Sequence, residues 1–272
     1  MQRQSADAQA LPVKVPIVIT IYFWIIKLCA TTVGGTSADL LMFNFHFGLS
    51  ATSLLMGGLL LSLVSIQLRA NRYIPWLYWV TVVLVSIVGT LITDNLTDQL
   101  GVPLVISSLG FAVVLLAVFV CWYKSEGTLS IYRIDTTRRE LLYWAAILFS
   151  FALGTALGDL LAASQGMGYA LSALLFAGVI VAIMIGFYKF NLNAIATFWL
   201  AYILTRPLAA SLGEYLSQPV INGGQGLGPI TTSAIMLFGL LGLVSFVTVK
   251  RIDAATPVTI ESPAFEAEAA KD

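Results

Sequence analysis

The segment 24-WIIKLCATTVGGTSAD-39 determines the plan of this chain, because its pattern returns three more times along the sequence. It opens with a tryptophan and ends, fifteen residues later, with an acid. The pairs that show this interval are Trp24 and Asp39, Trp79 and Asp94, Trp144 and Asp159, and Trp199 and Glu214. Only 14 of the 272 residues are acidic, so four such coincidences indicate an internal repeat.

Small residues accompany each acid at fixed positions. Position ten after the tryptophan holds Gly34, Gly89, Gly154 and Ala209, and position eleven holds Gly35, Thr90, Thr155 and Ala210. The tryptophans are spaced by 55, 65 and 55 residues, so the chain also divides into two halves that are offset by 120 residues. A two-helix unit that was duplicated twice explains both intervals.

Apolar runs that are long enough to cross a bilayer fill most of the chain. The composition is 58% hydrophobic and 10% charged, whereas a soluble chain carries about 25% charged residues. Eight runs of about 20 residues, the length that spans a hydrocarbon core, cover 15–38, 47–67, 74–96, 102–123, 141–163, 167–187, 192–216 and 229–249. We therefore expect an all-α membrane protein of eight transmembrane helices, arranged as four two-helix repeats of the same orientation.

The same runs leave no room for a soluble catalytic domain. The sequence contains no hydrolase, haem or nucleotide motif, so we expect neither an enzyme nor a cofactor. Cys29 and Cys121 lie in different runs and near different depths, which predicts no disulfide.

Lysine and arginine are concentrated in alternate loops. They flank the two ends of the chain and join the second run to the third, the fourth to the fifth and the sixth to the seventh, at Arg3, Lys14, Arg69, Arg72, Lys124, Arg133, Arg138, Arg139, Lys189, Lys250, Arg251 and Lys271. The opposite loops, around 40–46, 97–101, 164–166 and 217–228, contain none. Because positively charged loops stay in the cytoplasm, we expect both termini inside, in a bacterial inner membrane.

Three regions follow from these patterns. We expect a disordered N-terminal tail over 1–14, a transmembrane domain over 15–250 and a disordered C-terminal tail over 251–272, since both tails are polar. Within the domain, the repeats cover approximately 15–68, 72–124, 138–188 and 191–250.

These features resemble a known family. The tandem two-helix units, each with its tryptophan, and the stretch from Lys27 to Asp39 are similar to a bacterial family described only as repeats of unknown function or as uncharacterised membrane-anchored proteins. The resemblance covers residues 15–250. It implies the plan of eight helices in four repeats and implies no particular activity.

The four repeated acids are the first candidate site. If the units surround one axis, Asp39, Asp94, Asp159 and Glu214 converge into a ring at the external ends of the odd-numbered runs. The small residues before the acids, and the glycine or threonine about one turn below them at Gly35, Thr90 and Thr155, would allow close backbone approach and expose oxygen atoms. Such a ring could attract cations, bind a hard metal ion through oxygen ligands or exchange protons. The alternative is that the carboxylates only mark where the membrane stops.

Two cations lie inside apolar runs, where a charge costs at least about 2.5 kcal/mol unless it is solvated or paired. Lys27 shares one helix face with Thr31 and Asp39. It lies about 18 Å below Asp39 along the helix, so its partner is on another helix, at the interface or in a ligand. Arg206 precedes Pro207, whose missing N–H frees a carbonyl group, and we expect Arg206 to face a cavity or a partner inside the bundle.

The aromatic residues and the single histidine allow simpler interpretations. The repeat tryptophans form either an inner aromatic belt or a tight contact between helices, whereas Trp76 and Trp122, beside charged loops, are typical of a belt. His46 is a candidate ligand or pH sensor, and its alternative role is in an interfacial aromatic cluster.

These observations favour a transporter or channel-like permease that passes a small solute along an axial cavity. A cation, either a divalent metal or an ion coupled to protons, is favoured because four acids and no bases face outside. One alternative is a small anionic solute bound by Lys27 and Arg206, and another is a membrane scaffold or sensor that transports nothing. The expected partners are the lipid bilayer and the small ion or solute, without nucleic acid, and a homo-oligomer is compatible with the sequence.

Overall fold

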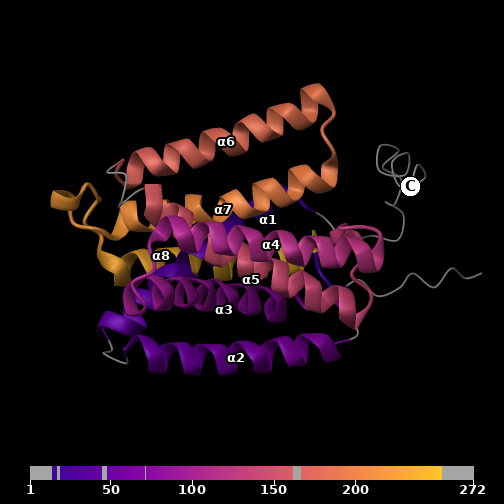
Figure 1. Cartoon of the computed structure of the whole chain (residues 1–272), viewed down its shortest axis with the longest axis horizontal. Helices are drawn as coiled ribbons and strands as arrows, with labels where there is room; N and C mark the ends of the chain where they lie inside the picture. Colours follow the sequence, from indigo (N-terminus) through magenta and orange to yellow (C-terminus); the bar gives the residue numbers. More distant parts are fainter. Residues whose placement is uncertain (1–13, 17–18, 45–47, 71, 162–166, 253–272) are drawn as a thin grey trace, which may run out of the picture.

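The chain folds into a bundle of long helices, seen in a computed structural model that describes residues 14–16, 19–44, 48–70, 72–161 and 167–252 (Figure 1). The described residues contain eight long α-helices and no strand. The helices are α1 (Ile21–Asp39), α2 (Leu49–Arg69), α3 (Pro75–Asp94), α4 (Leu104–Glu126), α5 (Thr137–Asp159), α6 (Tyr169–Phe190), α7 (Ala194–Ser217) and α8 (Gly228–Lys250). Each matches one of the apolar runs to within four residues, except that α1 begins six residues after the start of its run, and the all-α expectation is confirmed.

Local signals set where several helices begin and end. Pro75 opens α3 in the first turn, where its missing N–H leaves no intrahelical bond unmade. The side chain of Asn193 accepts a hydrogen bond from the Ala196 N–H at 2.9 Å and so caps α7. α4 ends at Gly127, whose φ of 70° lies in the left-handed region that glycine adopts without strain.

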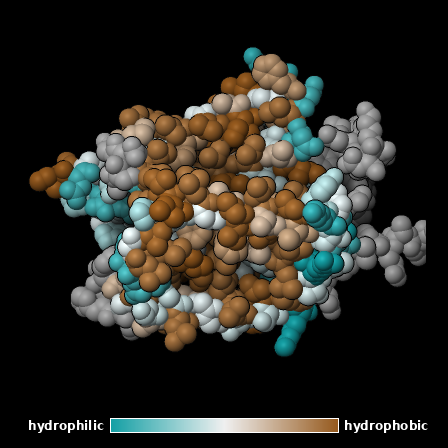
Figure 2. Space-filling model, in the orientation of Figure 1, coloured by the Kyte–Doolittle hydropathy of each residue, from teal (hydrophilic) through white to brown (hydrophobic). Residues whose placement is uncertain are grey.

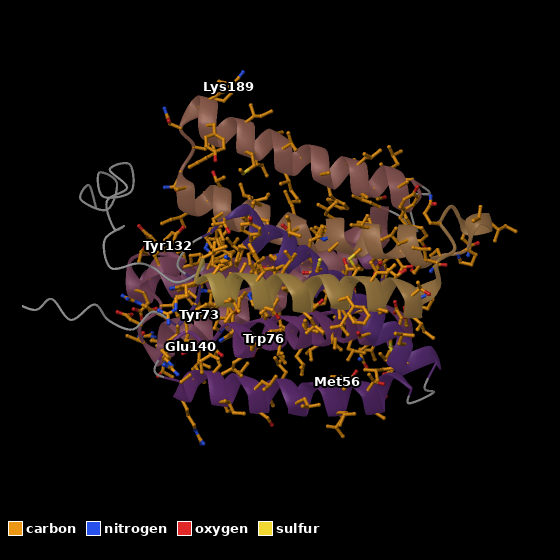
Figure 3. All side chains as sticks on the ribbon, turned by 180° about the vertical axis from the view of Figure 1, so that it is seen from behind. Met56, Tyr73, Trp76, Tyr132, Glu140 and Lys189 are labelled. Carbon is orange, nitrogen blue, oxygen red and sulfur yellow. The ribbon has the colours of Figure 1, made fainter. Side chains whose placement is uncertain are left out.

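The odd-numbered helices form an inner ring, and the even-numbered helices pack outside it. α1, α3, α5 and α7 contact one another in chain order, and α7 returns to α1. Outside the ring, α2 packs on α3, α4 on α5 and α6 on α7, while α8 packs on α1 and closes the circle. Figures 1 and 3, drawn from opposite sides, place α2 and α6 at opposite edges, with α4 across one face and α8 across the other. An even helix therefore packs mainly on the odd helix of the next repeat.

Small residues of the repeat bring the ring helices close together. A Cβ atom added to Gly89 of α3 would lie 2.8 Å from the Phe151 Cβ of α5, and one added to Gly154 would lie 2.6 Å from the Arg206 Cβ of α7. Both separations are shorter than real Cβ contacts, so glycine is required at these crossings. The close approach of backbones that we expected of these positions is present.

The surface of the bundle is that of a multi-pass membrane protein. In the described part of the chain, seven helices, α2 to α8, are long and apolar enough to cross a membrane. α1 falls short because its 19 residues include Lys27, Asp39 and several threonines and glycines. These polar residues are accommodated because α1 lies in the inner ring, where the side chain of Lys27 is fully buried. On the face drawn in Figure 2, hydrophobic residues cover the middle of the molecule and hydrophilic residues gather toward both ends.

The two ends of the bundle differ in charge. One end, called the basic end below, carries the basic residues in the last turns of the even helices, at Arg69, Lys124, Lys189 and Lys250. The other, called the acidic end, carries Asp39, Asp94 and Asp159 as the last residues of α1, α3 and α5. Figure 3 places Glu140 and Tyr132 toward the basic end and Met56 toward the acidic end.

The described chain enters the bundle at the basic end through a buried ion pair. The Lys14 Nζ lies 3.0 Å from the Glu140 Oε2 and donates to the Leu68 carbonyl oxygen at 2.9 Å. Lys14 is 8% exposed and Glu140 is fully buried. Lys14, which we assigned to the N-terminal tail, is therefore part of the folded bundle, because its charge is paired inside it. The rest of that tail and residues 253–272 lie outside the described residues.

The repeat tryptophans pack between helices. Trp79, Trp144 and Trp199 are between 3% and 4% exposed, which favours the contact role over the belt for these three, whereas Trp24 is half-buried and packs against Phe198. Trp76 is 38% exposed, as expected of a belt residue. Trp122 is only 1% exposed, and our belt assignment for it was wrong because its ring packs edge-on against Trp199, with ring centroids 5.7 Å apart.

Candidate functional site

Residues four apart on the ring helices stack into layers along the bundle axis. We name the layers at positions three, seven, eleven and fifteen after each tryptophan. The lysine layer is Lys27, Val82, Ile147 and Tyr202; the arginine layer is Thr31, Ser86, Phe151 and Arg206; the threonine layer is Gly35, Thr90, Thr155 and Ala210; the acid layer is Asp39, Asp94, Asp159 and Glu214. Every residue of the lysine and arginine layers is at most 1% exposed, as expected of side chains that face the axis.

The threonine and acid layers line one cavity at the acidic end, called the acid cavity below. Its volume is about 90 Å³, and its lining includes the four acids, Thr32, Thr36, Thr90, Thr155 and Arg206. The acids are half-buried at its mouth, whereas Arg206 is 1% exposed and forms its floor. The structure thus brings the four repeated acids together around the axis.

Arg206 is held by repeat residues of three other helices. Its Nε and Nη2 donate to the Thr155 Oγ1 at 3.2 and 2.9 Å, and its Nη1 donates to the Thr31 carbonyl oxygen at 3.2 Å. The Nη2 also donates to the Thr90 Oγ1. Gly35 lies beside the guanidinium, since a Cβ atom there would be in van der Waals contact with Nη1 at 3.4 Å. Four of the five guanidinium N–H groups are therefore engaged.

The acids share this cavity with Arg206 without pairing with it. Within the described residues, no carboxylate lies within 4.0 Å of the nitrogens of Arg206 or Lys27. The Glu214 Oε2 accepts a hydrogen bond from the Gln218 Nε2 at 2.7 Å. The guanidinium therefore contributes a nearby positive charge and no direct partner for the four carboxylates.

The threonine hydroxyl groups of the acid cavity donate hydrogen bonds to backbone carbonyl oxygens. Thr36, Thr90 and Thr155 each donate to the carbonyl oxygen four residues earlier in their own helices. Thr32 donates to the Ala209 carbonyl oxygen of α7 at 3.2 Å. A hydroxyl carries one proton and two lone pairs. Thr155 accepts twice from Arg206, Thr90 accepts once from it and Thr36 accepts from Ser233. The carboxylates are therefore the main acceptors that the cavity offers to a ligand.

The acids do not assemble a metal centre. No three His, Cys, Asp or Glu side chains in the described parts of the chain lie close enough together to hold a metal ion. Hard cations such as Ca²⁺ and Mg²⁺ require several oxygen ligands at about 2.0–2.6 Å. The four acids line one cavity without such close approach, and divalent-metal binding at Asp39, Asp94, Asp159 and Glu214 stays a prediction.

Lys27 lies one layer closer to the basic end than Arg206 and does not line the acid cavity. Its Nζ donates to the Tyr202 carbonyl oxygen at 2.9 Å and lies 4.0 Å from the centroid of the Tyr202 ring. It also lies 5.4 Å from the centroid of the Phe151 ring, which the Arg206 Cζ approaches to 5.5 Å. The sequence left three kinds of partner open for Lys27, and the structure shows that its partner is on another helix, α7.

Aromatic side chains fill the bundle between Lys27 and the basic end. The residues just before the tryptophans are Phe23, Tyr78, Tyr143 and Phe198. The Tyr78 and Tyr143 hydroxyl oxygens are 2.6 Å apart, and both side chains are at most 1% exposed. The Phe23 and Phe198 ring centroids are 6.4 Å apart. The axis is therefore packed on the basic side of the lysine layer and hollow on the acidic side of the arginine layer.

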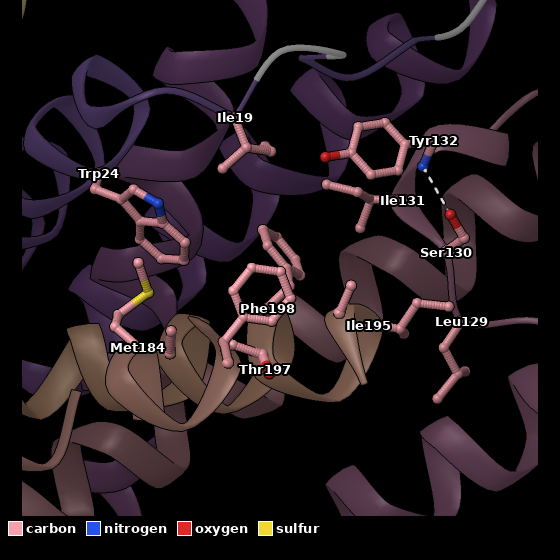
Figure 4. Close-up of a pocket in the computed structure, with 13 residues that line it drawn as sticks. Ile19, Trp24, Leu129, Ser130, Ile131, Tyr132, Met184, Ile195, Thr197 and Phe198 are labelled. Carbon is pink, nitrogen blue, oxygen red and sulfur yellow. Dashed lines mark hydrogen bonds between the residues drawn. The ribbon is translucent and has the colours of Figure 1, made fainter. Parts of the chain in front are cut away.

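A second cavity lies at the basic end (Figure 4). Its volume is about 200 Å³, and it is lined mainly by apolar side chains such as Ile19, Met184 and Phe198. Burial raises the pKa of the Tyr132 phenol on its wall. None of the repeated acids or axial cations lines this cavity, so it offers no charged site comparable to the acid cavity.

Phe151 and Tyr202 are axial residues that our sequence interpretation missed. They stand seven and three residues after their tryptophans, where the other repeats carry unrelated side chains. If the four repeats had been aligned and every fourth position had been followed from the acid back toward the tryptophan, both residues would have been placed on the axis. Of the predicted candidates, Thr31 contributes its carbonyl oxygen beside the cavity, and His46 lies outside the described residues.

Comparison with known proteins identifies the repeat. The family model described as Repeat of Unknown Function (DUF347) matches residues 22–73, 77–128, 142–192 and 197–253. Each match covers an odd helix and the even helix that follows it. No curated protein and no solved structure matches the chain.

Proposed function

The chain belongs to the family described as Repeat of Unknown Function (DUF347), and we propose that it is a membrane permease that takes a small cation into its acid cavity. One observation carries this proposal: four carboxylates from four repeats surround one axial cavity and remain unpaired with its only cation, Arg206. A cavity that offers acceptors and negative charge favours a positively charged ligand.

The size and chemistry of the cavity favour a small ion. About 90 Å³ accommodates a few water molecules or one small cation and excludes an extended organic substrate. Because no three acids among the described residues are close enough together to hold a divalent metal ion, the proposal commits to a monovalent cation such as an alkali ion or ammonium, with proton coupling as an option. Ring-like arrays of acidic side chains are a common way to concentrate cations at a pore mouth.

The anionic alternative draws less support. An anion needs free donors, and four of the five Arg206 N–H groups are already engaged by threonine residues and a backbone carbonyl. Lys27 is fully buried behind the arginine layer and does not line the acid cavity. Arg206 and Lys27 therefore do not line one cavity in which both could contact the same anion.

A purely structural role for the acids also draws less support. Buried or half-buried charges that serve packing are normally paired, because an unpaired charge is costly. Here Arg206 lies in the same cavity and is satisfied by threonine residues instead of the acids. This arrangement leaves the carboxylates free for a ligand.

The orientation follows from the distribution of charge. We place the basic end in the cytoplasm of a bacterium, because lysine and arginine accumulate on that side of inner-membrane proteins. The acid cavity then opens to the exterior, and the aromatic packing around Tyr78 and Tyr143 closes the cytoplasmic side. In this proposal the protein is a permease whose cavity faces outward.

Flux through proteoliposomes tests the proposal. Purified protein is reconstituted, and the uptake of sodium, potassium, ammonium, protons and manganese is followed with each acid neutralised in turn, as Asp39→Asn, Asp94→Asn, Asp159→Asn and Glu214→Gln. We expect uptake of at least one monovalent cation, and its loss on neutralisation.

Asp98→Asn provides the matched control, because Asp98 is an exposed acid at the same end that does not line the acid cavity. Flux that is unchanged by all four cavity substitutions, or that falls equally with Asp98→Asn, would contradict the proposal. Uptake of anions that depends on Arg206 would support the alternative instead.

A further inference from the structure

Phe151 lies between the hollow and the packed halves of the bundle axis. In the arginine layer, Thr31 and Ser86 are small, and Arg206 is drawn toward the threonine layer by its bonds to Thr90 and Thr155. Phe151 is therefore the bulky apolar side chain at this level, and it is fully buried. The acid cavity ends here, since Arg206 lines it and Phe151 does not.

The two axial cations, Arg206 and Lys27, both lie within cation–π distance of the Phe151 ring. The Arg206 Cζ lies 5.5 Å from the ring centroid, and the Lys27 Nζ lies 5.4 Å from it. Neither cation has a carboxylate within 4.0 Å among the described residues. An aromatic face stabilises a nearby cation through the negative potential of its π electrons. The ring of Phe151 is thus in contact range of two like charges from successive layers of the axis.

The backbone and Cβ atom of Phe151 are fixed by close packing against α3. Gly89 brings α3 against the first atoms of the Phe151 side chain, where an added Cβ atom would lie 2.8 Å from the Phe151 Cβ. Beyond the ring lie Val82 and Ile147 of the lysine layer, both fully buried. A ligand that moves from the acid cavity toward the basic end passes Arg206 at the cavity floor, and then meets Phe151 and these residues.

We propose that Phe151, braced by Arg206 and Lys27, is the gate that closes the acid cavity toward the basic end. The proposal rests on the proposed function for the meaning of the cavity, but the closure itself can be measured without any transport. Movement of the ring away from the axis would join the cavity to the lysine layer. Its two cation contacts link that movement to the positions of α1 and α7.

Cysteine accessibility tests the gate. In the full-length protein with Cys29→Ala and Cys121→Ala, single cysteines are introduced as Ala210→Cys in the cavity wall or as Ile147→Cys below the ring. Membrane vesicles with the acidic end outside receive silver ions, which are small thiol-reactive cations. The thiols that remain free are then counted by maleimide labelling after denaturation.

We expect silver to protect Ala210→Cys from maleimide and to leave Ile147→Cys free. Adding Phe151→Ala, or the milder Phe151→Val, should expose Ile147→Cys to silver, whereas Phe151→Trp should keep it unreactive. Phe149→Ala is the matched control, since this neighbouring phenylalanine of α5 does not belong to the axial layers. A single symmetrical peak in size-exclusion chromatography identifies the variants that fold.

The outcomes separate the gate from the function. If Ala210→Cys does not react in the parent, the cavity is closed to the outside and the proposed function fails with it. If Ala210→Cys reacts but Ile147→Cys stays unreactive in folded Phe151→Ala and Phe151→Val, the gate is overturned and the cation site stands. Reaction of Ile147→Cys in the parent or in Phe149→Ala also overturns the gate, because the closure would not depend on Phe151.

Discussion

The Arg206 guanidinium of α7 donates two hydrogen bonds to one hydroxyl of α5, from Nε and from Nη2 to the Thr155 Oγ1, at 3.2 and 2.9 Å. Thr155 belongs to the threonine layer of the repeat, whereas Arg206 occupies a position where the other repeats carry Thr31, Ser86 and Phe151. A residue unique to the fourth repeat is therefore bound by residues that belong to the repeat pattern.

This relationship predicts a stability cost at Thr155. Thr155→Val removes the acceptor while nearly preserving the shape of the side chain, so buried charged N–H groups lose their partner. We expect the free energy of unfolding to fall by about 1.5–3 kcal/mol. Thr155→Ser keeps the oxygen and should lose clearly less. Denaturant unfolding in detergent micelles measures both variants, and equal losses would contradict the role of the hydrogen bonds.

Gly154 is predicted to be intolerant of any side chain. An added Cβ atom would lie 2.5 Å from the Arg206 Cγ and 2.9 Å from the Pro207 Cδ. Gly154→Ala should therefore destabilise the fold by about 1–3 kcal/mol through overpacking. Gly178→Ala in α6 is the control, because a Cβ atom there meets nothing within 4 Å. Thermal unfolding of the two variants should differ in this direction.

The buried pair at the basic end is predicted to be strongly coupled to stability. Lys14→Met leaves the fully buried Glu140 without its cation, and breaking such a pair costs about 3–5 kcal/mol. Disrupting the more exposed pair of Arg139 and Asp135 by Asp135→Asn should cost less than about 1 kcal/mol. Unfolding of the full chain measures the difference, and similar small losses in both variants would refute it.

Tyr78 and Tyr143 are predicted to be energetically coupled. Their hydroxyl oxygens are 2.6 Å apart and buried, so removing one leaves the other without a partner at a cost of about 1–3 kcal/mol. The double variant with Tyr78→Phe and Tyr143→Phe should cost less than the sum of the single variants. A double-mutant cycle from unfolding data gives this coupling, and additive losses would contradict it.

The acid cavity is predicted to couple cation binding to stability. A cation that binds only the folded protein raises its free energy of unfolding, by about 2.7 kcal/mol at a concentration one hundred times the Kd. Ammonium or an alkali ion should therefore raise the unfolding temperature of the wild type, and Asp94→Asn should reduce this rise. Scanning fluorimetry at constant ionic strength measures the effect. Asp98→Asn should respond like the wild type, and an identical response from Asp94→Asn would contradict the prediction.

Much of the architecture could be predicted from particular residues. The interval from Trp24 to Asp39 and its three copies predicted four repeats, and the apolar runs predicted the helices, because both are local patterns of spacing and hydrophobicity. The convergence of the acids followed from assuming one axis. The burial of Trp122 and Lys14 did not follow, because each depends on a partner far away in the sequence, such as Trp199 or Glu140.

The sequence by itself determined the number and length of the helices, the fourfold repetition and the position of the acids at one end of every odd helix. Only the tertiary structure decided that α8 packs on α1, that Arg206 bonds to Thr155 and Thr90, and that Lys27 meets the carbonyl oxygen of Tyr202. The physical reason is that helix formation depends on neighbours along the chain. The register between helices instead depends on close contacts, such as Gly154 against Arg206, that form only when distant segments pack together.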